Sequence, residues 1–107
     1  ELLAEAVELF ISHDYPRHFK TIKGALKNGD PDEVASGAHG IKGPAASLGA
    51  TALQALAARL EAAGKENDLS AANETLAFLE TELELFKNVS RQSGLLTEEI
   101  NNGSNIK

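Results

Sequence analysis

The sequence contains no cysteine, no methionine and no tryptophan among its 107 residues. Without cysteine the chain can form neither a disulfide nor a thiolate metal site. No apolar run approaches the roughly 18 residues of a membrane-spanning helix, so we expect no direct membrane contact. Sixteen Asp and Glu residues against ten Lys and Arg residues give a net charge of −6, which repels a nucleic-acid backbone. These absences leave a small acidic domain with room for one hydrophobic core.

Apolar residues recur at intervals of three and four along most of the chain, and β-branched residues are sparse. This pattern is typical of amphipathic helices, and the short connections between them favour antiparallel neighbours. We therefore predict an all-α fold, an antiparallel four-helix bundle with an additional short N-terminal helix. The predicted helices cover about 1–12, 15–27, 31–48, 51–63 and 70–91.

Several residues mark the expected ends of these helices. Asp30 and Pro31 predict the N-cap and the first residue of the third helix, because the Asp side chain accepts a hydrogen bond from a free backbone N–H group and Pro lacks that group. Asp14 and Ser70 are the expected N-caps of the second and fifth helices. Gly64 is expected to end the fourth helix in a left-handed conformation.

The third predicted helix carries glycines and a proline around His39, in the stretch ASGAHGIKGPAAS over 35–47. Each interior Gly costs roughly 1 kcal/mol relative to Ala and an interior Pro about 3 kcal/mol, and Pro44 is expected to kink the helix. At about 100° per residue, His39 lies about 140° from the direction of the apolar side chains, so its imidazole is predicted to face solvent. The core-facing residues are Val34, Ala38, Ile41, Ala45 and Leu48.

The helical neighbours of His39 are mostly small. Gly43 and Ala35 are expected to clear space for a partner, because a solvated helix face normally carries longer side chains. Gly37 and Gly40 are expected to serve close packing or a local bend.

The one large neighbour of His39 is Lys42. An imidazole has an unperturbed pKa of about 6.5, so much of it is neutral and nucleophilic near pH 7. A lysine one turn away supplies positive charge for a phosphoryl group. The pair favours formation of a phosphohistidine.

The stretch AHGIKGPAASLGA resembles the histidine-containing phosphotransfer (HPt) domain, whose signature is H-x-x-K-G followed by small residues and L-G. The resemblance extends over about residues 2–92, including helix order. It implies that His39 takes a phosphoryl group from an aspartyl phosphate on one receiver domain and passes it to another receiver. By the same resemblance, Lys42 steadies the phosphate, Gly43 lets the receiver approach, and Mg²⁺ belongs to the receiver, so that this chain needs no cofactor.

Glu61, in the RLE triplet at 59–61, stands where some family members place a Gln that touches the histidine. Gln54 lies on roughly the same helical face, so either residue could orient the ring. A solvated side chain is the simpler interpretation of Glu61. Two residues depart from the family pattern: Pro44 replaces a common Ser, and Gly40 replaces a residue that is often bulkier.

Other interpretations of the sequence predict different functions. The main alternative is a helical bundle that binds a partner while its histidine stays idle. Metal binding by His13 and His18 is disfavoured, because no carboxylate–histidine pattern accompanies them. An enzyme with its own ATP site is disfavoured because no Gly-rich nucleotide loop or nucleophile motif is present.

Residues 1–92 are expected to form the domain, and the polar residues 93–107 a flexible tail. Because the chain does not begin with Met, we expect it to be a segment of a longer protein. The C-terminal part of a hybrid sensor histidine kinase is favoured, while a chemotaxis kinase module and a free-standing protein stay open. We expect a cytoplasmic location and a monomeric isolated domain.

Overall fold

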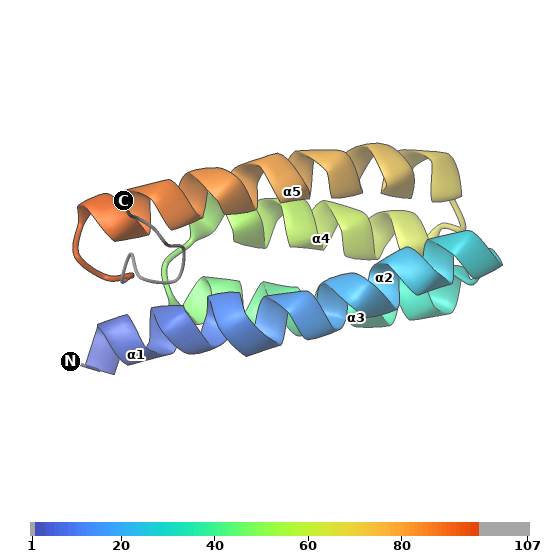
Figure 1. The fold of residues 1–107 in the computed structure, drawn as a ribbon. Helices are drawn as coiled ribbons and strands as arrows, with labels where there is room; N and C mark the ends of the chain where they lie inside the picture. Colours follow the sequence, from blue (N-terminus) through green and yellow to red (C-terminus); the bar gives the residue numbers. More distant parts are fainter. Residues whose placement is uncertain (1, 97–107) are drawn as a thin grey trace, which may run out of the picture.

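The computed structural model describes residues 2–96, which form an all-α chain (Figure 1). Within this range the antiparallel four-helix bundle is confirmed, and no helix is long and apolar enough to cross a membrane. Residues 97–107 of the predicted tail lie outside the described residues. The helical elements are α1 (Leu2–Leu9), the π-helical turn η1 (Phe10–Asp14), α2 (Tyr15–Asn28), α3 (Pro31–Ser47), α4 (Thr51–Lys65) and α5 (Leu69–Gln92).

The predicted break before the second helix is wrong, because α1, η1 and α2 form one continuous helical run (Figure 1). Asp14 has helical backbone angles, φ −66° and ψ −50°, and its side chain caps nothing. Pro16 accounts for the π turn, since Pro lacks an N–H group and its ring collides with the carbonyl four residues earlier in a regular α-helix. In η1 the N–H of Tyr15 instead reaches the carbonyl of Phe10, five residues back. This wider turn accommodates the proline without ending the helix.

Of the other two predicted N-caps, Asp30 is confirmed and Ser70 is wrong. Asp30 caps α3 by accepting a hydrogen bond from the backbone N–H of Glu33 at 3.2 Å. The cap of α5 is Asp68, which accepts from the N–H of Ala71 at 3.0 Å, so Ser70 is not the cap. With Asp68 as its N-cap, α5 begins at Leu69, one residue earlier than predicted.

Gly64 does not end α4 in a left-handed conformation but lies inside the helix, and the left-handed residue is Asn67 at φ 57°. A Cβ atom at Gly64 would stand 2.7 Å from both the carbonyl oxygen of Pro31 and the backbone nitrogen of Ala35. No side chain fits there, so this glycine lets α4 approach the backbone of α3 closely. The close approach lies one turn after Glu61.

The core lies between the four helices and draws on each of them. Of the core positions predicted for α3, Leu48 is only partly buried and the other four are fully buried. The phase of the helix is therefore as the spacing predicts. The largest fully buried side chains are Phe10, Ile22, Val34, Ile41, Leu53, Leu60 and Leu79.

Candidate functional site

The solvent-facing side of α3 is almost bare around His39. The His39 side chain is 70% exposed, as the helical spacing predicts. Apart from its chain neighbours and the nearby backbone of α3 itself, a Cβ atom at Gly43 would have no atom within 4 Å, so the space beside the imidazole is open. Between Ser36 and Ser47 the other exposed residues of α3 are small: Ser36, Ala46 and Ser47. We call this surface, formed by Ser36, His39, Gly43, Ala46 and Ser47, the bare face of α3.

Ala35, which was predicted to clear space on this face, is instead buried. It lies where α4 approaches α3 at Gly64, so its small side chain serves helix packing. Gly37 and Gly40 also serve close packing, which is one of the two alternatives predicted for them. A Cβ atom at Gly37 would stand 2.6 Å from Cγ1 of Ile22 in α2.

Glu61 of α4 joins His39 to two lysines. Its Oε2 atom lies 3.2 Å from Nδ1 of His39 and 3.3 Å from Nζ of Lys65, and its Oε1 atom lies 2.7 Å from Nζ of Lys42. The Glu61 side chain is only 10% exposed, so these contacts are shielded from water on one side. The solvated interpretation of Glu61 is therefore wrong. The four side chains form what we call the His39–Glu61 cluster.

The charge on Glu61 follows from its lysine neighbours. The hydrogen bond from Lys42 is the largest influence and, with Lys65, lowers the pKa of Glu61 to about 2, although burial acts in the opposite direction. At neutral pH Glu61 is thus a carboxylate, which can only accept hydrogen bonds. The proton between the two side chains must belong to Nδ1 of His39. In the neutral imidazole the lone pair then lies on Nε2.

One member of this cluster, Lys65, was not predicted from the sequence, and one alternative left open there is decided by the structure. Lys65 follows Glu61 by four residues, a spacing at which helical side chains meet, and this spacing is the signal that indicates it in the sequence. Gln54 was considered as a partner of His39, but it is exposed and no hydrogen bond joins the two among residues 2–96. The residue that contacts the ring is Glu61.

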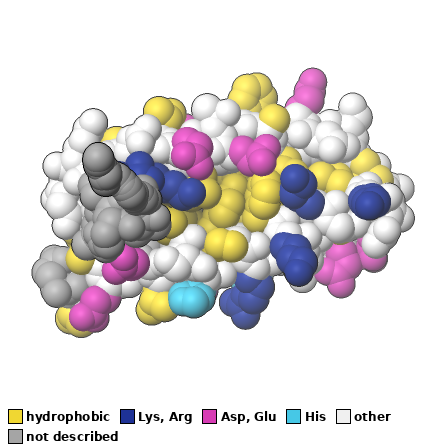
Figure 2. All heavy atoms as spheres, in the orientation of Figure 1, with side chains coloured by type: hydrophobic (Ala, Val, Ile, Leu, Met, Phe, Trp, Pro, Cys, Tyr) yellow, Lys and Arg dark blue, Asp and Glu magenta, His cyan; other side chains and the backbone are white. Residues whose placement is uncertain are grey.

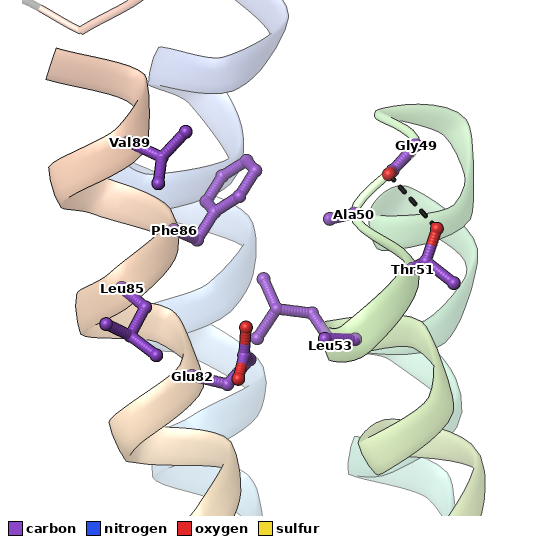
Figure 3. Close-up of a pocket in the computed structure, with 9 residues that line it drawn as sticks. Gly49, Ala50, Thr51, Leu53, Glu82, Leu85, Phe86 and Val89 are labelled. Atoms are coloured by element: carbon purple, nitrogen blue, oxygen red, sulfur yellow. Dashed lines mark hydrogen bonds between the residues drawn. The ribbon is translucent and has the colours of Figure 1, made fainter. Parts of the chain in front are cut away.

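A separate groove of 290 Å³ lies between the start of α4 and the end of α5 (Figure 3). Leu53 and Phe86 extend toward each other across it, and Leu85 and Val89 stand along α5. Hydrophobic side chains are also visible between the helix layers in Figure 2, flanked by charges of both signs. None of the residues of the His39–Glu61 cluster lines this groove. Within residues 2–96 no group of three or more His, Asp or Glu side chains is arranged to hold a metal ion.

The bundle and the cluster define an α-helical domain that presents the His39 imidazole on its surface with Nδ1 held against a carboxylate. The family model of the Hpt domain matches residues 5–89, and the chain therefore belongs to the Hpt domain family. Hpt domains are phosphotransfer carriers in two-component signalling and interact with response-regulator receiver domains. No curated protein matches the chain, and no solved structure does.

Proposed function

We propose that this Hpt domain accepts a phosphoryl group on Nε2 of His39 from the aspartyl phosphate of one receiver and passes it to the aspartate of another. The observation that supports this most is the 3.2 Å contact between Nδ1 of His39 and the Glu61 carboxylate. It favours the tautomer whose lone pair lies on Nε2, and the side chain is largely exposed.

The transfer follows from this arrangement. The Nε2 lone pair forms the N–P bond while the O–P bond of the aspartyl phosphate breaks, and the electron pair of that bond returns to the receiver's carboxylate. Nδ1 keeps its proton, so the imidazole ring gains positive charge. Glu61, as a carboxylate beside Nδ1, stabilises that charge. Onward transfer is the same step in reverse with a second receiver.

Lys42 is the cation that we assign to the phosphoryl oxygens. Its side chain is 35% exposed and bonds to Glu61 in the unphosphorylated chain. A phosphoryl group on Nε2 adds negative charge one helical turn away, which attracts the ammonium group. Lys65 can stay with Glu61 when Lys42 turns toward the phosphate.

Further expectations about the context of this domain rest on the family. The Mg²⁺ ion that assists phosphoryl transfer belongs to the receiver, and the bare face of α3 admits that receiver close to His39. We take residues 1–92 as the phosphotransfer unit, monomeric as an isolated domain and located in the cytoplasm. A hybrid sensor histidine kinase is the parent chain that we favour.

The experiment compares His39→Gln with His13→Gln, which removes an exposed histidine of η1. Each purified variant is incubated with a ³²P-labelled receiver. We expect wild type and His13→Gln to gain an acid-labile, base-stable label, whereas His39→Gln folds normally by circular dichroism and gains none. Label that persists in His39→Gln would refute the assignment, and an unlabelled wild type would support an interaction module with an idle histidine.

A further inference from the structure

The space left by the missing side chain at Gly40 is filled by a residue of the neighbouring helix α2. A Cβ atom at Gly40 would stand 2.3 Å from Cε1, 2.5 Å from Nδ1 and 2.6 Å from Nε2 of His18 in α2. All three distances are far below van der Waals contact. The imidazole of His18 therefore occupies the space into which a side chain at residue 40 would extend.

This position lies beside the candidate phosphorylation site. Gly40 directly follows His39, and successive helical side chains diverge by about 100°. Glu61 reaches His39 from α4, whereas His18 covers Gly40 from α2. The bare face of α3 is thus bordered by Lys42, Glu61 and Lys65 on the α4 side and by the His18 ring on the α2 side.

The charge state of the His18 ring follows from its surroundings. The ring is half-buried, and burial, followed by the charge of Arg17, lowers the pKa of His18, while Asp14 acts in the opposite direction. The guanidinium of Arg17 lies 3.5 Å from Nε2 of His18 and 3.8 Å from the Asp14 carboxylate. At neutral pH α2 therefore presents an uncharged, flat ring at the border of the bare face.

Phosphoryl transfer requires the receiver's aspartate to come within bonding reach of Nε2 of His39. Because the His39 side chain is 70% exposed on the bare face, a folded receiver that reaches that atom rests on this face and also contacts its borders. We propose that His18 is a receiver-docking residue: its ring supplies from α2 the contact surface that Gly40 does not supply from α3. This inference rests on the proposed function, and it assigns His18 to receiver binding rather than to the transfer step.

The test measures the initial rate of transfer from a phosphorylated receiver over a range of receiver concentrations. His18→Ala is expected to raise the half-saturating concentration about five- to thirtyfold, the loss typical of truncating a buried contact at an interface. The saturating rate should stay within about twofold, because His18 touches no reacting atom. His13→Ala is the matched control. Its half-saturating receiver concentration and its saturating rate should both equal those of wild type.

Gly40→Ala tests the docking role of His18 independently, because the added methyl group displaces the His18 ring without removing it. It should raise the half-saturating concentration as His18→Ala does, and the double variant should be no worse than the more affected single variant. If His18→Ala lost its fold, Gly40→Ala alone would give the measurement.

Labelling of His39 by phosphoramidate, which needs no docking surface, separates the possible failures. If phosphoramidate labels both wild type and His18→Ala, but the receiver's half-saturating concentration is unchanged in His18→Ala, the docking role of His18 is refuted while the proposed function stands. Additive effects of His18→Ala and Gly40→Ala would likewise refute the pairing. If neither phosphoramidate nor a receiver labels wild-type His39, the proposed function itself fails.

Discussion

Replacing Glu61 with Gln tests both the electrostatics and the chemistry of the cluster. In the folded chain Lys42 and Lys65 lower the pKa of Glu61 from 4.5 to about 2. One pKa unit corresponds to about 1.4 kcal/mol, so the shift contributes at most about 3–4 kcal/mol to the free energy of unfolding. Lys65 is 69% exposed and water screens its charge. We therefore expect Glu61→Gln to lower the free energy of unfolding by about 1–3 kcal/mol at pH 7.

The pH dependence has a definite sign. The pKa of Glu61 is lower in the folded state than in the unfolded state, so the carboxylate contributes its full stabilisation above about pH 4.5. This stabilisation is lost as the pH falls toward 2, where the folded state also becomes protonated. The difference in unfolding free energy between wild type and Glu61→Gln should shrink across that window.

Urea unfolding followed by circular dichroism at pH 7, 4.5 and 2.5 measures this difference. Glu74→Gln, at an exposed glutamate of α5, serves as the control and should show no such convergence. If the difference in unfolding free energy between wild type and Glu61→Gln stayed constant between pH 4.5 and 2.5, Glu61 would not be held ionised by its lysines.

The same variant tests the tautomer of His39. A Gln side chain can donate as well as accept, so it no longer requires the proton on Nδ1. We expect ¹⁵N spectra to show the Nδ1–H form in the wild type and a mixture of tautomers in Glu61→Gln, together with slower labelling by phosphoramidate. An unchanged tautomer in the variant would mean that Glu61 does not orient the ring.

Two further predictions concern the glycines and Lys42. Gly43→Ala should raise the free energy of unfolding by about 0.5–1 kcal/mol, because the position is open, whereas Gly64→Ala should lower it by about 1–3 kcal/mol, because its methyl group meets the backbone of α3. Urea unfolding measures both, and a change of the same sign at the two positions would contradict the packing described for them. Lys42→Ala should slow transfer from a receiver by about tenfold and shorten the lifetime of the phosphohistidine. Equal rates and lifetimes in variant and wild type would leave Lys42 only as a partner of Glu61.

Local interactions explain why parts of this fold could be predicted from the sequence. The phase of α3 depends on residues three and four apart, so the exposure of His39 follows from the spacing of its apolar neighbours. The start of α3 depends on Asp30 and on an N–H group three residues later, again within one turn.

The junction at η1 shows where local reasoning fails. The sequence around Pro16 permits either a helix break or a π turn, because both avoid the clash of the proline ring. Tertiary packing favours the continuous helix: Phe10 is buried, and its ring centroid lies 6.1 Å from that of Tyr15 and 6.0 Å from that of Phe86 of α5, each pair in a T-shaped arrangement. A break between Phe10 and Tyr15 would change how the two rings lie relative to each other, and so disturb this contact.

The sequence by itself determined the helical fold, the outward direction of His39 and the open space at Gly43, because each depends on the periodicity of one helix. Only the tertiary structure decided that Glu61 contacts the imidazole and that His18 covers Gly40. His39 and Glu61 are 22 residues apart and belong to different helices, so their contact depends on how closely α3 and α4 pack. That distance is decided at Gly64, where the two backbones meet without an intervening side chain.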